Sequence, residues 1–326
     1  MKTLLLNGKE VEALLSIEET VEAVKSGYIA YNQGMVSMPP VVSLLASEYN
    51  GEMDFKMGYS KPESIIGIKM AGGYWDNPKK YSLPSGIAMI CLFDARNGTP
   101  LCILDGTLIT GYRTAAAGAI GAMLLARKNS ENIAVFGTGM QARLQLLAIS
   151  KYFKIKNVKV SGRNGAESYI EEMKQILPFV NFQLSSAQEA AESADIIITA
   201  TASHTALIKE AWVKPGTHIN AIGCDMEGKQ ELDPYLFKNA KIVNDNKSEC
   251  KKRGDTQHAF NAGIITEQDI HAEIGEILLG EKCGRIDANE ITIFDATGLS
   301  VQDINTSLFI YHKAIEQSVG RNIEIL

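Results

Sequence analysis

The sequence has little that would mark a metal, nucleic-acid or membrane protein. Its five cysteines are widely separated and form no C-x-x-C pair, which indicates reduced, buried thiols and no metal site. The N-terminal leucine run is too short for a secretory signal, and no window approaches ~18 uninterrupted apolar residues. Acidic residues outnumber basic ones, 38 to 32, without a concentrated basic face, which argues against binding a phosphate backbone. We therefore expect a cytoplasmic protein with neither membrane nor nucleic acid as a partner.

The chain is long enough for about two domains. It has 326 residues, against a usual ~150 residues per domain. Hydrophobic residues make up 45% and charged residues 21%, which is ordinary for a globular protein. No segment is biased enough in composition to indicate disorder, so we expect the chain to fold throughout.

The first third of the chain predicts helices followed by a sheet. The first ~35 residues are typical of helix, with Asn7 and Ser16 as N-cap candidates and Gly34 as a stop. From Val41 to about Leu104, short apolar runs broken by Gly, Pro and Asn predict a mainly antiparallel sheet.

The rest of the chain predicts a different architecture. Small and apolar residues from Thr114 to Arg127 indicate a buried helix. Apolar strands then alternate with helices, which predicts a parallel sheet with right-handed crossovers. The last segment, "SVQDINTSLFIYHKAIEQSV", is typical of an amphipathic helix that returns to the first domain. The fold class is therefore α/β, with a Rossmann-type dinucleotide-binding domain (114–302) and a discontinuous α+β domain (1–113 with 303–326).

A glycine motif opens the parallel part. "NIAVFGTGMQARLQLLAI" combines a strand, the loop from Gly137 to Ala142 and a helix, with a second strand ~20 residues further on. Gly137 would permit the tight turn, Gly139 would let the backbone approach a pyrophosphate, and Ala142 would allow close packing. Helix amides would face the phosphates. This context predicts a bound dinucleotide; a glycine turn without ligand is the alternative.

The end of the second strand predicts which dinucleotide binds. NAD-selective enzymes usually place a carboxylate there for the ribose 2′-hydroxyl. This chain has Gly162 followed by Arg163, and a guanidinium binds a 2′-phosphate bidentately. We predict NADP(H) over NAD(H); the alternative is a solvated arginine in a turn.

Two cations stand in apolar surroundings upstream. Lys69 lies in "IIGIKMAGGYWDNPKK", and Arg113 directly precedes the predicted buried helix. Alone, the lysine would extend to water and the arginine would make a structural pair. Together, because an unpaired buried cation is costly, they indicate an anion such as a substrate carboxylate.

Several segments, in order, resemble the ornithine cyclodeaminase/mu-crystallin family, which includes archaeal-type alanine dehydrogenases and ketimine reductases. They are "MPP", "GIKMAGGYWDNPKK", "LFDARNGTPLCILDGTLITGYRTAAAGAIGA", "GTGMQA", "GTHINAIGCDMEGKQELDP" and "FDATGLSVQD". The resemblance implies a homodimer whose first domain, completed by the C-terminal helix, forms the interface. It also implies a Rossmann domain and a small-molecule substrate.

The resemblance implies roles residue by residue. Lys69 and Arg113 would bind the substrate carboxylate, Asp225 would be the catalytic acid/base with Lys69 as a second catalytic group, and Thr297 would lie beside nicotinamide and substrate. The positions that match cofactor contacts are Ser85, Met140, Gln141, Thr199, Asn220, Ala221 and Lys229. The cofactor-binding set also includes Gly137 and Gly139 from the glycine motif, Arg163 from the end of the second strand, and Arg113.

Two departures from the family pattern bear on the substrate. Many members have a basic residue after "MPP", where this chain has Val41 and Val42, so Lys56 is a candidate replacement in the carboxylate clamp. The cyclodeaminase has a glutamate where this chain has Phe55, with Asp54 close by, which disfavours cyclisation of ornithine.

The chemistry follows from these candidates. An aspartic acid near its reference pKa of ~3.9 is ionised at pH 7, so Asp225 would act as an acid only if desolvated, and otherwise as an ionised base. We expect an NADP(H)-preferring oxidoreductase, with NAD(H) as the alternative cofactor, acting on a small α-amino acid, keto acid or cyclic imine. The alternatives are a cyclodeaminase-type lyase and a low-turnover binding protein like mu-crystallin.

Overall fold

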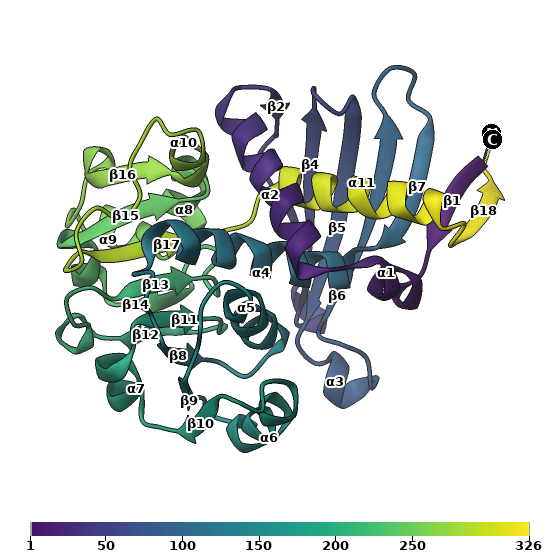
Figure 1. Cartoon of the computed structure of the whole chain (residues 1–326). Coiled ribbons are helices and arrows are strands. Elements are labelled where there is room, and N and C mark those ends of the chain that lie inside the picture. Colours follow the sequence, from purple (N-terminus) through teal and green to yellow (C-terminus); the bar gives the residue numbers. More distant parts are fainter. Residues whose placement is uncertain (1, 326) are drawn as a thin grey trace. The chain divides into compact units, whose positions relative to one another are not determined.

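The computed structural model describes residues 2–325, which form two compact units (Figure 1). The first unit comprises Met1–Arg113 and Leu299–Leu326, and the second comprises Thr114–Gly298. The first boundary lies inside helix α4 (Gly106–Leu125), and the return to the first unit precedes helix α11 (Ser300–Glu316). The role of each unit in binding stays a prediction.

The first unit contains an eight-stranded sheet in the order β18-β1-β7-β6-β5-β4-β2, with β3 also paired to β4. Its central strands pair antiparallel, which confirms the sheet expected from the broken apolar runs. The strands that build it are β2 (Val36–Ser37), β3 (Val42–Ala46), β4 (Gly51–Ser60), β5 (Ile65–Tyr74), β6 (Gly86–Asp94) and β7 (Pro100–Asp105).

The sequence predicted helix for the whole N-terminal segment, and this is wrong for its first residues. Strand β1 (Lys2–Leu6) comes first, followed by α1 (Gly8–Leu14) and α2 (Ile17–Asn32). Both predicted N-caps are confirmed. The side chain of Asn7 accepts hydrogen bonds from backbone amides in the first turn of α1, and the side chain of Ser16 accepts one from the backbone amide of Glu19 in α2. The leucine run pairs in parallel with β7, and this long-range pairing prevails over local helix propensity.

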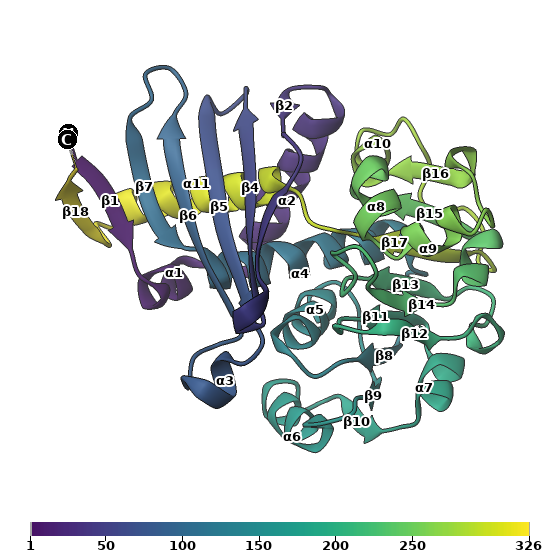
Figure 2. The same cartoon turned by 180° about the vertical axis from the view of Figure 1, so that it is seen from behind.

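Helix α11 covers one face of this sheet, as Figures 1 and 2 show from opposite sides. It contacts α2 and strands β4, β5 and β6. Its first half is buried almost all round, so it is more enclosed than the predicted amphipathic helix. After α11, strand β18 (Arg321–Glu324) pairs antiparallel with β1, so both ends of the chain lie on one sheet edge. Two short elements complete the unit: η1 (Ser47–Tyr49) and α3 (Asn77–Lys80).

The opposite face of the sheet is apolar and exposed. Large hydrophobic side chains of this face on β3, β5 and β6 remain between 43% and 59% exposed. They are Val42, Leu44, Ile66, Ile87 and Met89. A contiguous apolar face of this kind is typical of a surface that another protein covers.

The second unit is a parallel sheet in the order β10-β9-β8-β11-β13-β17-β15-β16. All its strand pairs are parallel, which confirms the expected alternation of strands and helices. The order reverses between β8 and β11, which is the switch point of a doubly wound fold. The elements expected from the sequence are β8 (Asn132–Phe136), α5 (Met140–Ser150), β9 (Asn157–Ser161), α6 (Ala166–Ile176), β10 (Asn181–Leu184), β11 (Ile196–Thr199), β13 (His218–Ala221), β15 (Ala240–Asn244) and β17 (Ile291–Asp295).

Several short elements of this unit were not predicted from the sequence. Most follow turns and have few residues, so their apolar residues show no clear period. They are α7 (Ala187–Ser193), β12 (His204–Ile208), η2 (Glu210–Trp212), β14 (Gln230–Leu232), η3 (Pro234–Lys238), α8 (Lys247–Arg253), α9 (Thr256–Asn261), η4 (Glu267–Asp269), β16 (Ile270–Glu273) and α10 (Ile274–Leu278).

Helix α4 begins earlier than the predicted Thr114 and therefore contains Arg113. By length and composition it would be able to cross a membrane, and among the described residues it is the one helix that meets these criteria. However, 67% of its most apolar window is buried inside the structure, as in the core helix of a globular protein.

Candidate functional site

The glycine loop between β8 and α5 has the geometry that the motif predicts. Gly137 has φ 109°, and a Cβ there would lie 2.6 Å from the carbonyl oxygen of Ala200. Gly139 caps α5, and no described atom lies within 4 Å of the place a Cβ would take. The loop therefore needs glycine for its turn and leaves open backbone at the helix start, where an anionic group binds well.

A cavity of about 830 Å³ adjoins this loop at the carboxyl ends of β8, β9 and β11. Ligands of open α/β sheets bind at such an edge. The exposed Arg163 belongs to the lining, so it stands where the sequence placed it. Other lining residues are Gly137, Thr138, Asn164, Thr201 and His204.

The start of α5 presents two further predicted residues. Met140 is 42% exposed, and Gln141 is half-buried. The Oε1 atom of Gln141 is buried and has no hydrogen-bond partner within residues 2–325. An orphaned acceptor beside the glycine loop fits a bound dinucleotide, whose hydroxyl and amide groups donate hydrogen bonds.

The side chain of Asn220 is used inside the fold. Its Nδ2 donates to the carbonyl oxygen of Gly118 at 2.9 Å, and its Oδ1 lies 2.8 Å from Nε2 of His218. Burial lowers the pKa of His218 to about 3, so its ring is neutral at pH 7. Asn220, Ala221 and Thr199 are all buried, so dinucleotide contacts there would come from strand-end backbone and stay predictions.

Ser85 and Thr297 occupy different surroundings. Ser85 is half-buried before β6, and its carbonyl oxygen accepts from the Tyr74 amide at 2.7 Å. Thr297 is buried after β17, with Oγ1 3.4 Å from Oδ1 of Asp245. The predicted contacts of both residues with cofactor or substrate stay predictions.

Asp225 and Lys229, predicted to have separate roles, form an ion pair. Nζ of Lys229 lies 2.6 Å from Oδ1 of Asp225, whose side chain is 51% exposed. The condition for an acidic Asp225 was strong desolvation, and this exposure does not meet it. The pairing favours the charged carboxylate, so the ionised alternative fits the structure.

The segment that carries Asp225 is held in place from α8 and α9. Nε of Arg253 donates to the carbonyl oxygen of Asp225 at 3.0 Å, and Nε2 of His258 lies 2.6 Å from the carbonyl oxygen of Lys229. The amide of Gly228 donates to Oε1 of Gln257 at 2.9 Å. These bonds fix a loop that has no regular structure of its own.

Lys69 and Arg113 lie together in the first unit, but they already have an anion partner. Asp303 of α11 accepts from Nζ of Lys69 at 2.9 Å and from Nε of Arg113 at 3.0 Å. The structural pairing that was the alternative for Arg113 is therefore present, and binding of a substrate carboxylate stays a prediction. Gln302 adds an acceptor 3.2 Å from Nη1 of Arg113. Lys56, the candidate clamp residue, is directly opposite Lys69 in the β4–β5 register.

This cluster carries more positive than negative charge. Burial lowers the pKa of Lys69 to about 7, the positive charge of Arg113 acts in the same direction, and Asp303 opposes both. Burial raises the pKa of Asp303, but Arg113 and Lys69 outweigh it and hold the value below its ordinary range. Two cations, Lys69 and Arg113, thus share the carboxylate of Asp303, a charge balance that favours binding a further anion.

The sequence did not single out Asp303 and Gln302. Both residues lie in "SVQD", a segment that carries the family resemblance but implies no role for either of them. Pairing with Lys69 depends on packing between segments more than 200 residues apart in the chain. No local spacing rule would have found it.

Three buried carboxyl groups in the second unit were also missed. Glu231, Asp255 and Asp295 are at most 1% exposed. Burial raises the pKa of each, that of Asp295 to about 7. Among residues 2–325, no three His, Cys, Asp or Glu side chains are grouped so as to hold a metal ion.

The cysteines agree only partly with expectation. Cys224 is buried, and burial raises its pKa far above the ordinary value, so the thiol stays protonated. Cys102 and Cys250 are also buried. Cys283 is exposed and Cys91 is half-buried, so the expectation of buried thiols fails for these two.

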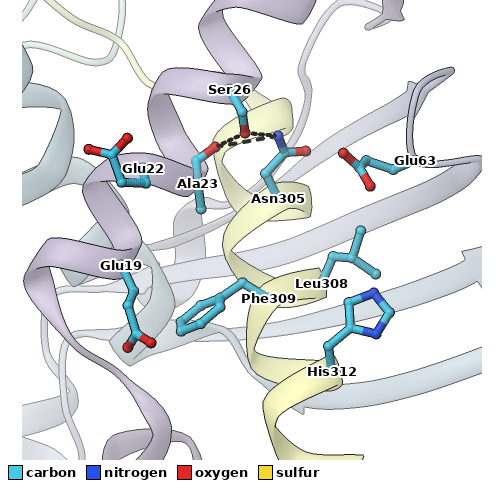
Figure 3. A pocket seen from close by; sticks show the side chains of 9 residues that line it. All are labelled: Glu19, Glu22, Ala23, Ser26, Glu63, Asn305, Leu308, Phe309 and His312. Carbon is cyan, nitrogen blue, oxygen red and sulfur yellow. Dashed lines mark hydrogen bonds between the residues drawn. The ribbon is translucent and has the colours of Figure 1, made fainter.

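A pocket of about 460 Å³ over α2 and α11 contains none of the predicted site residues (Figure 3). Its carboxylates Glu19 and Glu22 are paired with Lys313 and Lys25, each at 2.7 Å. Nδ2 of Asn305 donates to groups of α2, as the dashed lines show. Lysines therefore neutralise two of the three carboxylates that line this pocket, the third being Glu63.

Comparison with known proteins supports one family. A chain from Archaeoglobus fulgidus named alanine dehydrogenase is 38% identical and covers 99% of both chains. An iminosuccinate reductase from Paracoccus denitrificans is 32% identical, with 97% of this chain and 98% of the relative covered. A Δ1-pyrroline-2-carboxylate reductase from Bacillus cereus is 30% identical, with 98% and 99% covered.

Solved structures agree along the whole length. An archaeal alanine dehydrogenase dimer with bound NAD matches with a TM-score of 0.94 at 37% identity, covering 100% of both chains. A Thermococcus litoralis Δ1-pyrroline-2-carboxylate reductase with NADH and L-proline matches with a TM-score of 0.95 at 34% identity, covering 98% and 100%. These neighbours confirm the α/β fold with a Rossmann-type domain. The family model described as ornithine cyclodeaminase/mu-crystallin matches residues 1–318, and the chain belongs to that family.

Proposed function

We propose that the protein is an NAD(P)-dependent oxidoreductase that acts at Cα of a small α-amino acid or its imine. The observation that carries this proposal is the buried cluster in which Lys69 and Arg113 share the carboxylate of Asp303. Its surplus positive charge suits a substrate carboxylate. The relatives named alanine dehydrogenase, iminosuccinate reductase and pyrroline-2-carboxylate reductase support the same substrate class.

The cofactor is a nicotinamide dinucleotide, which supplies or accepts hydride when bound. The glycine loop would hold the pyrophosphate, and Gln141 would accept a hydrogen bond from the dinucleotide. Arg163 in the lining of the cavity supports NADP(H) over NAD(H), because a guanidinium suits a 2′-phosphate. Two structural neighbours contain NAD or NADH, so both cofactors belong in the test.

The residues of the chain would bind the substrate and stabilise charge. Arg113 would hold the substrate carboxylate through its guanidinium, with Lys69 as a second donor. Asp225, ionised and paired with Lys229, would stabilise the cationic iminium or ammonium nitrogen. Hydride added to Cα of the iminium would move the C=N bonding pair to nitrogen and give the amino acid as its free amine. A neutral imine would first take a proton from water, which yields the same product.

The assembly proposed is a homodimer in the cytoplasm. The exposed apolar side chains of β3, β5 and β6 give the first unit a surface that a second copy of the chain would cover. The archaeal alanine dehydrogenase structure is described as a dimer. Sedimentation would test this, and Leu44→Asp, on a side chain that is 59% exposed, should convert a dimer to monomers.

A substrate panel tests the function. Consumption of NADPH and NADH would be followed with pyruvate plus ammonia or methylamine, oxaloacetate plus ammonia, pyrroline-2-carboxylate and piperideine-2-carboxylate. Net cofactor oxidation with any of them supports the proposal. Release of ammonia from ornithine without net cofactor change would instead assign a lyase, and tight dinucleotide binding without turnover would assign a binding protein.

A further inference from the structure

Glu231 is a buried carboxylate with donors from two separate segments. It lies in β14 and is 0% exposed. Its Oε1 accepts from the amide and from Oγ1 of Thr201, each at 2.6 Å, and its Oε2 accepts from the amide of Gly223 at 2.9 Å. Burying a carboxyl group costs free energy unless donors satisfy it. Three donors to this one side chain therefore indicate that Glu231 holds the two segments together by specific hydrogen bonds.

The two tied segments leave neighbouring strands at the same edge of the sheet. Thr201 follows β11 and Gly223 follows β13, and these strands pair in parallel. A side chain at Gly223 would collide with the backbone of Thr201 and come within 2.6 Å of Oε1 of Glu231. The segments thus pack backbone against backbone at the carboxyl edge, where such sheets bind ligands.

Each segment continues into a part of the candidate site. Ala200 precedes Thr201, and its carbonyl oxygen fills the space beside Gly137 in the glycine loop. Asp225 follows Gly223 by two residues. A shift of either segment would therefore move the glycine loop relative to Asp225.

Glu231 is itself held by a second carboxyl group. Oδ1 of Asp255 accepts from the amides of Glu231 at 2.8 Å and Leu232 at 3.0 Å. The amide of Asp255 in turn donates to Oδ1 of Asp295 at 3.2 Å. The side chain that joins the two segments is therefore held by a buried hydrogen-bond network.

We propose that Glu231 is a positioning residue that fixes the glycine loop and the Asp225 segment relative to each other. This inference rests on the oxidoreductase function proposed above. Glu231 acts through Thr201 and Gly223 and contacts neither substrate nor dinucleotide. A misplacement of about 1 Å in such a site costs up to about 100-fold in rate.

The main test is Glu231→Gln, assayed for kcat, thermal midpoint and amide hydrogen exchange. The glutamine keeps the shape of the side chain, but its amide nitrogen would face the donors of Gly223 or Thr201. Hydrogen bonding to one of the two segments is then lost. We expect kcat to fall at least tenfold, and exchange to accelerate in residues 199–203 and 222–228 only. Glu227→Gln, at an exposed carboxylate of the Asp225 loop, is the matched control and should change neither kcat nor hydrogen exchange.

A second variant keeps the test decisive if Glu231→Gln does not fold. Thr201→Val removes the hydroxyl donor and keeps the amide, so a smaller loss, about threefold or more in kcat, is expected. Wild-type kcat in the folded Glu231→Gln protein, or in Thr201→Val when the former is unfolded, would overturn the inference. If the wild-type protein turns over no substrate, the proposed oxidoreductase function fails. Independently of that result, unchanged hydrogen exchange in both variants would refute the positioning role of Glu231.

Discussion

Asp303 accepts hydrogen bonds from Lys69 at 2.9 Å and from Arg113 at 3.0 Å, so one carboxylate of α11 orients two candidate substrate-binding cations. The Lys69 and Asp303 side chains are each only 2% exposed. Because water does not screen the pair, its electrostatic effect is much larger than that of an ion pair on the surface. Two predictions concern this pair.

Asp303→Asn should destabilise the protein strongly. Removing one partner of a buried ion pair leaves the other charge uncompensated, which costs roughly 3–5 kcal/mol of unfolding free energy. Urea denaturation would measure the loss. Glu22→Gln, which breaks the exposed pair with Lys25, is the matched control and should leave stability almost unchanged. Equal stability of both variants would contradict the structural role of Asp303.

The Michaelis constant for a carboxylate substrate should rise with pH. Burial lowers the pKa of Lys69 to about 7, so the free protein carries this charge below that pH and loses it above. We expect KM to increase from about pH 6 to about pH 9, as the attraction for the carboxylate weakens. Steady-state kinetics across this range would measure it.

Lys69→Arg provides the control for this pH dependence. An arginine stays protonated throughout the range, so KM should become nearly independent of pH even if its absolute value changes. If the variant keeps the wild-type slope, another group is responsible.

The architecture was predictable where periodicity is local. The parallel strands of the second unit are apolar runs between helices, and the glycine loop has a sequence signature. Strand β1 was not recognised, because its pairing with β7 and β18 joins distant parts of the chain. Such pairing depends on tertiary contacts that no window of sequence contains.

The candidate site was predictable in residue type but not in its internal contacts. Lys69, Arg113 and Asp225 were found from apolar context and family resemblance. The pairing of these residues with Asp303 and Lys229 could not be predicted, because Asp303 lies on a distant helix and Lys229 on a loop without a regular period. The buried carboxyl network around Glu231 was missed because each acid has the appearance of a surface charge in sequence.

Arg163→Ala should reduce the use of NADPH selectively. Loss of a charge-assisted hydrogen bond to the 2′-phosphate is worth about 1.5–3 kcal/mol, or about tenfold or more in kcat/KM. The value with NADH should change less than about threefold, since that cofactor has no 2′-phosphate. Arg321→Ala, an exposed arginine of β18, is the control. A tenfold preference of the wild-type protein for NADH would refute the assignment.

The second unit should be more stable in mild acid than in mild base. Burial raises the pKa of Asp295 to about 7, against bonds from Thr256 that lower it. Because the folded pKa exceeds the unfolded one, the stabilisation present below about pH 4 is lost as pH rises to about 7. The thermal midpoint should therefore be higher at about pH 5 than at about pH 8. Asp295→Asn should reduce this difference, while Asp287→Asn, at an exposed site, should not.

Asp225→Asn should abolish most turnover while preserving dinucleotide binding. The asparagine keeps the shape of the side chain but removes the negative charge that pairs with Lys229 and would stabilise a cationic nitrogen. We expect kcat to fall by about 100-fold or more, and the dissociation constant for the dinucleotide, measured by fluorescence, to change less than about threefold. Glu227→Gln removes a charge from the same loop and should retain full turnover. Near-normal turnover in Asp225→Asn would exclude this residue from the chemistry and leave the cation cluster of the first unit as the centre of any remaining mechanism.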